Sequence, residues 1–412
     1  MNSQTITDTR QPSFVLPKGT PAAAATVLGL LQRLRHGSLT LQFPDGSMHR
    51  FGGNASPHAT IALHNWNVCA ASLKSGDIGF AESYIAGDWS TPNLTELLRV
   101  LVKNRTVMED AIYGSWAGRL LYRMRHWMNR NTRANSQKNI HAHYDLGNAF
   151  YRLWLDETMN YSSALFEGDL QQPMPQAQKA KVRRALTEAG VRPGDRVLEI
   201  GCGWGALAEM AITEFDAHLT GVTLSTEQLA FAQQRMERLG VAQRADLRLQ
   251  DYRDIADAPF DAICSIEMVE AVGREYWPTY FQAIRQLLKP GGRACVQSIV
   301  IDDALYERYI HSTDFIQQYI FPGGCLPSPQ QFRQQAQAAG LQVEKELAFG
   351  RDYAETLRRW RESFLAQREQ VLAGGFDERF VRIWEFYLAY CEAAFDEGNI
   401  DVVQYTLVKP AA

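Results

Sequence analysis

The pattern of hydrophobic and polar positions predicts a long region of alternating strands and helices. From about residue 179, short apolar runs typical of buried strands alternate with segments of helical periodicity. This alternation predicts a parallel sheet with helices on both faces. Pro290-Gly291-Gly292 predicts a sharp turn into the fifth strand, and residues 301–340 predict a helical insert with a loop. The predicted strands are 196–200, 218–224, 246–250, 261–266, 293–300, 342–347 and 402–408, and the predicted helices are 205–214, 225–239, 275–288, 353–373 and 377–397.

A shorter region precedes this one and has a different pattern. Residues 1–20 are polar and contain two prolines, so we expect a disordered tail. Residues 21–104 predict a small α+β domain with a hairpin that turns at Pro44-Asp45-Gly46-Ser47. Its predicted elements are a helix at 22–34, strands at 38–43 and 48–51, short strands or part of a helix at 60–63 and 67–71, and an amphipathic helix at 94–102.

Residues 105–138 form a linker in which basic and aromatic side chains interleave. Arg119, Arg123 and Arg125 alternate with apolar positions between Trp116 and Trp127. A basic amphipathic helix of this composition suits an anionic membrane surface. A helix that bridges two domains, with solvated arginines, fits the same pattern. Nucleic acid is not expected as a partner, because no nucleic-acid-binding motif accompanies the basic residues.

Composition narrows the class of protein. A chain of 412 residues with 46% hydrophobic residues predicts two or three packed domains. The net charge of −4 gives no global attraction to nucleic acid. Six scattered cysteines without a C-x-x-C pair fit a reducing cytoplasm and predict neither structural zinc nor any other metal site. We see no signal peptide and no apolar run near the ~20 residues of a membrane span, so we expect action from the membrane surface at most.

The most informative segment is Val197-Leu-Glu-Ile-Gly-Cys-Gly-Trp-Gly205. A buried strand ends at Ile200, and Gly201, Gly203 and Gly205 make a tight turn into a helix. Glycine lets the backbone approach a ligand, and a helix N-terminus favours a carboxylate or phosphate. Such a turn binds either a dinucleotide or S-adenosylmethionine. A dinucleotide site also requires an acidic residue at the tip of the second strand, where the chain has Thr223-Leu224-Ser225. That difference, together with Glu199 just before the turn, favours S-adenosylmethionine.

Several separated segments together resemble one family. They are His141–Asn148, Met159–Phe166, the glycine turn, Gly221–Ser225 with Gln228, Glu267–Gly273, Ile320–Gly324 and Phe386–Cys391. In this order they resemble the cyclopropane-fatty-acyl-phospholipid synthases, which include the mycolic acid methyltransferases. The resemblance covers residues 80–410. It implies an α/β fold: a class I S-adenosylmethionine-dependent methyltransferase with a Rossmann-like, mostly parallel seven-stranded sheet, a helical lid over an acyl tunnel and a catalytic domain at 139–412.

The resemblance also implies a donor site. Tyr161 and Ser162 would contact the methionine part of S-adenosylmethionine, and the glycine turn would lie under the donor beside Glu199. Thr223 and Gln228 would hold the ribose, with Leu224 beside them, and Asp251 and Tyr252 would line the adenine pocket. Each of these residues also has a structural interpretation, since Thr223 and Gln228 could cap a helix and Tyr252 could belong to the core.

In the resembled enzymes a bound bicarbonate serves as the base. Glu270, Tyr387 and Ile299 match its binding residues in the family pattern, whereas Ser163 stands where the family has cysteine and Gln297 where it has histidine. Serine and glutamine can still donate hydrogen bonds to an anion. Neither supplies the positive charge of a histidine.

The predicted activity is therefore methyl transfer to the double bond of an unsaturated acyl chain of membrane phospholipid. The leading product is a cyclopropane, formed when the new methyl loses a proton. The alternative product, suggested by Ser163 and Gln297, is a methyl-branched or methyl-alkene chain. A small-molecule methyltransferase and a lipid carrier are the other hypotheses. The resemblance makes a homodimer plausible, and we expect peripheral association with the inner leaflet of the membrane.

Overall fold

A computed structural model describes residues 14–107 and 146–411 of the chain. The chain divides into two compact units, Met1–Ser115 and Trp116–Ala412. The predicted basic linker at 105–138 lies almost wholly outside the described residues, as does most of the predicted tail. No helix within the described ranges is long and apolar enough to cross a membrane.

The first unit holds a four-stranded sheet with helices. Its strands follow the order β2-β1-β3-β4, in which β1 pairs antiparallel with β2 and parallel with β3. The 67–71 segment, for which strand and helix were both open, is the first turn of α2, which reaches Ala86 with a kink at Gly76, where the backbone is not helical. The elements are α1 (Ala22–Leu31), β1 (Ser38–Gln42), β2 (Met48–Gly52), β3 (His58–Leu63), α2 (Asn67–Ala86), β4 (Trp89–Ser90) and α3 (Leu94–Lys103).

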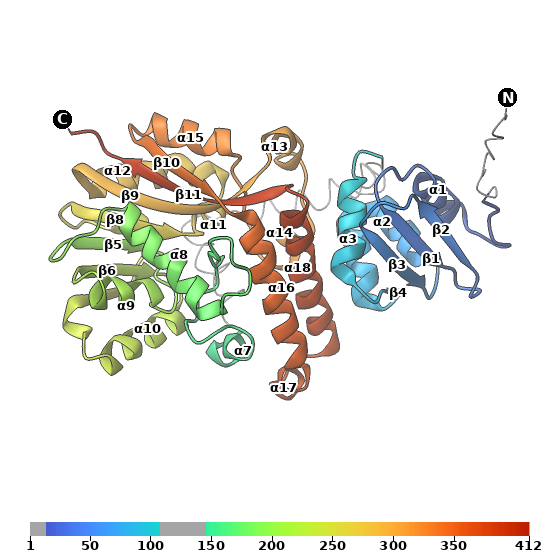
Figure 1. Cartoon of the computed structure of the whole chain (residues 1–412), viewed down its shortest axis with the longest axis horizontal. Helices are drawn as coiled ribbons and strands as arrows, with labels where there is room; N and C mark the ends of the chain where they lie inside the picture. The colour runs from blue at the N-terminus through green and yellow to red at the C-terminus, as the bar shows by residue number, and fades with distance from the viewer. Residues whose placement is uncertain (1–13, 108–145, 412) are drawn as a thin grey trace, which may run out of the picture. The chain divides into compact units, whose positions relative to one another are not determined.

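The second unit is built on a seven-stranded sheet in the order β10-β11-β9-β8-β5-β6-β7 (Figure 1). Only β11 runs against the direction of the other six strands, because it pairs antiparallel with both β9 and β10. The predicted Rossmann-like, mostly parallel sheet is confirmed. The strands are β5 (Arg196–Ile200), β6 (His218–Thr223), β7 (Ala245–Leu249), β8 (Phe260–Ile266), β9 (Leu288–Ile301), β10 (Gln342–Ala348) and β11 (Ile400–Val408).

Helices cover both faces of this sheet. Alternate residues of a strand point to opposite faces, so Val197 of β5 joins one core cluster and Leu198 the other. One cluster lies under α8, α9 and α10, and the other under α12 and α15. The helices are α7 (Asn148–Arg152), α8 (Met174–Glu188), α9 (Ala206–Thr213), α10 (Thr226–Arg238), α11 (Val269–Val272), α12 (Trp277–Leu287), α13 (Asp303–Tyr309), α14 (Phe315–Tyr319), α15 (Pro329–Ala338), α16 (Gly350–Ala366), α17 (Arg368–Ala373) and α18 (Glu378–Asp396); short 3₁₀ turns are η1 (Ala242–Arg244), η2 (Tyr252–Asp254) and η3 (Arg274–Tyr276).

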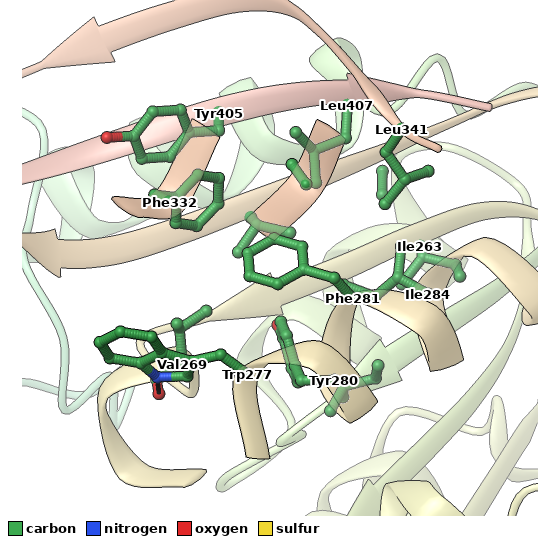
Figure 2. Packing of buried hydrophobic residues seen from close by; sticks show 14 of the residues in the cluster. Ile263, Val269, Trp277, Tyr280, Phe281, Ile284, Phe332, Leu341, Tyr405 and Leu407 are labelled. Carbon is green, nitrogen blue, oxygen red and sulfur yellow. Dashed lines mark hydrogen bonds between the residues drawn. The ribbon is translucent and has the colours of Figure 1, made fainter. Parts of the chain in front are cut away.

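Aromatic rings pack closely in the core cluster under α12 and α15 (Figure 2). Phe332 of α15 stacks on Tyr405 of β11 with ring centroids 3.8 Å apart, and Phe281 of α12 meets Phe332 edge-on at 5.0 Å. Trp277 and Tyr280 of α12 are also buried there. Such aromatic pairs add to the hydrophobic stabilisation of burial. This packing fixes β9 and β11, which carry residues of the candidate site.

Two sequence predictions need correction. The predicted turn at Pro290–Gly292 lies inside β9, at the place where the register between β8 and β9 shifts. The predicted helix at 353–373 is two helices, α16 and α17, which meet at Gln367. It also begins earlier than predicted, because Asp401 of β11 accepts a hydrogen bond from the backbone N–H of Gly350 over 2.7 Å. This bond comes from a distant strand, so local pattern could not reveal it.

Candidate active site

The glycine turn joins β5 to α9 at the carboxyl end of the parallel strands. The backbone N–H groups of Gly201 and Cys202 both donate to the carbonyl of Val222 on β6, each over 3.0 Å. Gly201 has φ +87°, and a Cβ there would lie 2.4 Å from the sulfur of Met268. Gly203 has φ +49°, and a Cβ there would meet no protein atom within 4 Å. The turn thus packs tightly on one side and leaves open space on the other.

That open space belongs to a cavity of about 1170 Å³, open solvent at its mouth included. Its walls come from the glycine turn, the tips of β6 and β7, the end of β8 and the segment before α8. Every predicted donor residue except Gly205 lines it; Gly205 is the N-cap of α9 and packs against Ala232. The predicted residues in the lining are Tyr161, Ser162, Glu199, Gly201, Gly203, Thr223, Leu224, Gln228, Asp251 and Tyr252.

Two buried polar atoms of the cavity residues suit a ligand. Oε2 of Glu199 and the hydroxyl of Tyr252 have no hydrogen-bond partner among the described residues. Burial raises the pKa of Glu199 to about 8, against the attraction of Lys181 and Arg235. Buried polar groups without partners are rare in proteins and call for an explanation. An ammonium or a hydroxyl of a bound S-adenosylmethionine would supply the missing partner, so the residues present fit the donor.

The predicted ribose residues are already linked to each other. The hydroxyl of Thr223 donates to Oε1 of Gln228 over 3.1 Å. The cap of α10 is neither of them, because Ser225 accepts the N–H of Gln228 over 3.2 Å. The hydroxyl of Thr223 in turn accepts the N–H of Ser225 over 3.2 Å, so Thr223 supports the start of α10 although Ser225 is its N-cap. Asp251, which was predicted to line the adenine pocket, pairs with Arg253, which also lines the cavity.

A buried lysine contacts one of the residues predicted to bind the methionine part of the donor. Lys181 of α8 is 1% exposed, and its ammonium donates to the hydroxyl of Ser162 over 2.5 Å. Burial lowers the pKa of Lys181 to about 8, although Glu267, Asp156 and Glu199 attract the charged form. The sequence analysis did not include Lys181. Its position between Ala177 and Ala185, one helical turn from each, was an available signal that it lies on the buried face of α8.

None of the five predicted catalytic residues, all of them described, lines this cavity. Tyr387 of α18 reaches it through Tyr161, with 2.7 Å between the two hydroxyl oxygens. Glu270 accepts the backbone N–H of Ile299 over 3.1 Å and lies 3.4 Å from the hydroxyl of Ser298. The family resemblance implied that Glu270 and the backbone of Ile299 both bind bicarbonate, and in the structure they bind each other directly.

Ser163 and Gln297 contact a different carboxylate. The backbone N–H of Ser163 donates to Oε1 of Glu267 over 2.9 Å, and the side-chain amide of Gln297 donates to the same oxygen over 2.7 Å. The hydroxyl of Ser163 donates to its neighbour's carbonyl, that of Ala164. The structure therefore places Ser163 and Gln297 around Glu267, which the sequence analysis did not assign a role.

Glu267 follows β8 directly and lines the cavity. The signal that could have identified it is its position: an acidic residue at the carboxyl end of a central parallel strand, as Glu199 is on the neighbouring β5. The hydroxyl of Tyr353 on α16 donates to its Oε2 over 2.7 Å. The charge of Glu267 opposes ionisation of Glu270: burial first, and then Glu267, raise the pKa of Glu270 to about 8.

Aromatic rings and the helical insert enclose this end of the site. Tyr161 packs against Trp154 and Trp360, with ring centroids 5.6 and 5.5 Å away. The insert reaches the site as well, because the N–H of Cys325 donates to the carbonyl of Glu270 over 2.8 Å and the ring of Phe321 lies 6.1 Å from that of Tyr387. Aromatic rings and the insert therefore enclose the two carboxylates together with their polar partners.

The sheet, the glycine turn and the cavity define a class I S-adenosylmethionine-dependent methyltransferase. Comparison with known proteins then identifies the family. A model of the mycolic acid cyclopropane synthetase family matches residues 131–405, and the chain belongs to this family. The predicted family resemblance is confirmed.

Individual relatives extend the comparison over the whole chain. A tuberculostearic acid methyltransferase, UfaA1, of Mycobacterium tuberculosis is 40% identical over 99% of this chain and 97% of its own length. The cyclopropane-fatty-acyl-phospholipid synthase of Escherichia coli is 34% identical over 85% of this chain and 88% of its own. Among solved structures, mycolic acid cyclopropane synthase CmaA1 with bound SAH is 33% identical to this chain, with a TM-score of 0.62. The match covers 66% of this chain and 98% of the CmaA1 chain.

Proposed function

We propose that the protein transfers a methyl group from S-adenosylmethionine to the double bond of an unsaturated acyl chain of membrane phospholipid and gives a C-methylated chain. The observation that carries this proposal is the arrangement of the cavity, in which the glycine turn and the partly buried carboxylate of Glu267 line one space beside an aromatic wall. A donor site that opens on an acidic, water-poor region is what methylation of an alkene requires.

Bound S-adenosylmethionine supplies an electrophilic methyl group. An isolated double bond is a weak nucleophile, and its attack leaves positive charge on the chain. Tyr161, Trp154 and Trp360 keep water from this charge, and the faces of their rings are attractive to a cation. Glu267 and Glu270 provide fixed negative or dipolar groups near the developing charge. A proton must then leave the chain to a base.

The donor residues named above hold S-adenosylmethionine in this proposal. Glu199 accepts from its ammonium, Thr223 and Gln228 bind the ribose, and Asp251 and Tyr252 contact the adenine. Tyr161 and Ser162 orient the methionine end, with Ser162 itself held by Lys181. Each of these side chains lines the cavity except Lys181, which lies behind it.

Two observations favour a C-methylated product. The relative that is 40% identical over nearly the entire chain is a tuberculostearic acid methyltransferase. Ser163 and Gln297 also depart from the pattern of the cyclopropane-forming enzymes that the chain resembles. Cyclopropane formation is the second candidate, and the similarity to the Escherichia coli synthase favours it. Neither reaction consumes a reductant. The C-methylated product therefore retains one double bond, and the cyclopropane product has one ring in its place.

The other parts of the chain receive roles consistent with a membrane substrate. Residues 21–104 are proposed to be a lipid-binding-like domain, and the basic linker at 105–138 a contact with anionic lipid that keeps the protein peripheral at the inner leaflet. A homodimer is proposed from the family resemblance. These roles rest on sequence pattern, since the linker lies outside the described residues.

The test is incubation of the purified protein with unsaturated phospholipid vesicles and S-adenosylmethionine, followed by mass spectrometry of the released acyl chains with double-bond derivatisation. We expect a gain of one CH₂ with the alkene retained. A gain of one CH₂ with loss of the alkene would show cyclopropane formation. Binding of S-adenosylmethionine without any change in the acyl chains would favour a small-molecule methyltransferase, and no donor binding would favour a lipid carrier.

A further inference from the structure

We propose that Glu267 is the proton acceptor of the reaction and takes the place of the bicarbonate that the family resemblance implies. This inference rests on the proposed methyl transfer to an unsaturated chain. It assigns the base to a side chain of the protein itself.

The first argument is that two residues expected to hold bicarbonate already bind a carboxylate. The side-chain amide of Gln297 and the backbone N–H of Ser163 both donate to Oε1 of Glu267, and the hydroxyl of Ser163 donates to the carbonyl of Ala164. Both residues are fully buried, so their positions are fixed by the surrounding structure. A carboxylate presents the same pair of oxygens as bicarbonate does. Glu267 therefore occupies the amide of Gln297, which a free anion would otherwise need.

The second argument is electrostatic. A bicarbonate ion at this place would lie beside the carboxylate of Glu267, and like charges in a poorly solvated site repel strongly. Burial raises the pKa of both Glu267 and Glu270. The charge of Glu267 adds to this effect at Glu270, whereas Tyr353, Lys181, Ser163 and Gln297 oppose it at Glu267. The surroundings of the two carboxyl groups therefore differ, as they do in pairs that divide the roles of acid and base.

The third argument is geometric. Glu267 has φ +54°, in the left-handed region that non-glycine residues rarely adopt. Such strain persists only where the surroundings enforce it and is concentrated at active sites. Here its own N–H donates to the carbonyl of Gln297 over 2.8 Å, and its side chain accepts three further bonds. The backbone conformation directs this carboxylate into the cavity wall next to Met268, which packs on Gly201.

The carboxylate retains capacity to accept a proton. An ionised carboxylate has about four lone-pair positions. Among the described residues, Oε1 accepts hydrogen bonds from Ser163 and Gln297, and Oε2 accepts one from Tyr353 alone. One lone-pair position on Oε2 is therefore left for a proton.

The proposed step balances without a further reactant. The electron pair of the alkene forms the bond to the incoming methyl carbon, and the neighbouring chain carbon becomes a cation. The cation loses a proton to Oε2 of Glu267, and the C–H electron pair forms a new double bond or closes a ring. Glu267 becomes a neutral acid and later releases the proton to solvent.

The first variants to test are Glu267→Gln and Glu267→Gly. Glu267→Gln keeps the volume of the side chain but removes its basicity, so turnover should fall by about 10²–10⁴-fold, the usual contribution of a general base. Glu267→Gly suits the positive φ and leaves Ser163, Gln297 and Tyr353 around a space that an anion can enter. Added bicarbonate should restore turnover to Glu267→Gly and not to Glu267→Gln. Glu214→Gln, an exposed glutamate paired with Arg183, is the matched control and should behave like the unaltered protein.

Two further measurements do not depend on turnover. Each variant should bind S-adenosylhomocysteine by calorimetry as the unaltered protein does. Carbon-13-labelled bicarbonate should bind to Glu267→Gly and not to the unaltered protein. If neither Glu267 variant folds, Tyr353→Phe serves instead. Loss of its hydrogen bond raises the pKa of Glu267, so the acidic limb of the rate profile should move to higher pH, which a merely structural tyrosine would not cause.

The outcomes separate this inference from the proposed function. If the unaltered protein forms no product that has gained CH₂, the proposed function is wrong. If it forms product but requires bicarbonate, or if Glu267→Gln turns over normally, the assignment of Glu267 is wrong. The same conclusion follows if Glu267→Gly binds S-adenosylhomocysteine yet bicarbonate does not rescue it, or if Tyr353→Phe leaves the rate profile unchanged.

Discussion

Gln297 connects the carboxylate of Glu267 to the centre of the sheet. Its Nε2 donates to Oε1 of Glu267 over 2.7 Å, and its Oε1 accepts from Nε2 of Gln404 over 2.9 Å. Gln297 and Gln404 are register partners on β9 and β11, and both are fully buried. A side-chain amide has both a donor and an acceptor. Gln297 can therefore hold a carboxylate at one end while the sheet fixes the other.

Gln297→Met keeps most of the side-chain volume but removes both bonds. A hydrogen bond to a charged group contributes about 1.5–3 kcal/mol, so we expect kcat to fall about 10–100-fold while S-adenosylhomocysteine binds normally. The free energy of unfolding should also decrease, since Gln404 loses a buried partner. Steady-state kinetics, calorimetry and urea unfolding measure these effects. The exposed Gln334→Met on α15 is the control. An unchanged kcat would show that Gln297 does not position Glu267.

Glu270→Gln tests a buried acid through the pH dependence of stability. Burial raises the pKa of Glu270 to about 8 in the folded protein, whereas an unfolded glutamate titrates near ~4.3. Between these values the folded state binds more protons, so its contribution to stability is present at low pH and is lost as pH rises toward 8. Glu270→Gln should flatten the decline in the free energy of unfolding between about pH 5 and pH 8.

The slope should not disappear entirely, because Glu199 titrates with the same sign. Urea unfolding at several pH values measures how the free energy of unfolding changes with pH, with Glu214→Gln as the control. Turnover of Glu270→Gln should be lost while donor binding is retained, since Glu270 does not line the donor cavity. A slope identical to that of the unaltered protein would contradict the buried, protonated state of Glu270.

Lys181→Met should shift the pH dependence of catalysis. Lys181 is one of the groups that oppose the rise in the pKa of Glu267, so its removal raises that pKa further. A base with a higher pKa is ionised only at higher pH, and the acidic limb of the kcat/KM profile should move upward. Lys179→Met, exposed on the same helix, is the matched control. An unmoved limb would show that Lys181 has only a structural role at Ser162.

Much of the fold could be predicted because strand periodicity and glycine positions are local signals. The strand at 196–200 and the glycine turn agree with the structure, and the boundaries of most other strands differ by one or two residues. The helix α2 was harder to predict. It includes Gly76, with φ +63°, and Gly79, where a Cβ would lie 2.0 Å from the carbonyl oxygen of Ala71. Close packing decides this helix, and glycines argue against a helix when only the sequence is read.

The two ends of the site differed in how far they could be predicted. Most of the predicted donor residues lie at or just after strand ends, and the parallel sheet brings strand ends together, so motif and topology were sufficient to predict that these residues line one cavity. At the reaction end, the partner of Ser163 and Gln297 depended on three-dimensional contacts. Both residues were predicted to bind bicarbonate, and in the structure the amide of Gln297 and the backbone N–H of Ser163 donate to the side chain of Glu267. Glu267 is far from Ser163 along the chain, so no local pattern could reveal their hydrogen bond. The positive φ of Glu267 also has no local signal in the sequence.

Membrane binding can be tested at the basic linker. Replacement of Arg119, Arg123 and Arg125 by glutamine should weaken binding to anionic vesicles, by about 1 kcal/mol per residue near the surface, and the loss should be larger at low salt. Vesicle co-sedimentation at two salt concentrations measures it. Replacement of Arg183, Arg293 and Arg333, three arginines paired with surface glutamates, is the control. Unchanged binding would favour the interpretation of the linker as a bridge between domains.

Gly203→Val tests the donor cavity directly. The position faces open space beside the glycine turn, so the branched side chain would fill the volume that the donor requires while meeting no protein atom at its Cβ. The positive φ adds strain of about 1–2 kcal/mol, which could lower stability by itself. Gly240→Val is the matched control, because Gly240 also has a positive φ and open surroundings but lies outside the cavity. Both variants should lose similar stability in thermal unfolding, and only Gly203→Val should fail to bind S-adenosylhomocysteine in calorimetry. Normal binding by Gly203→Val would contradict the assignment of this cavity to S-adenosylmethionine.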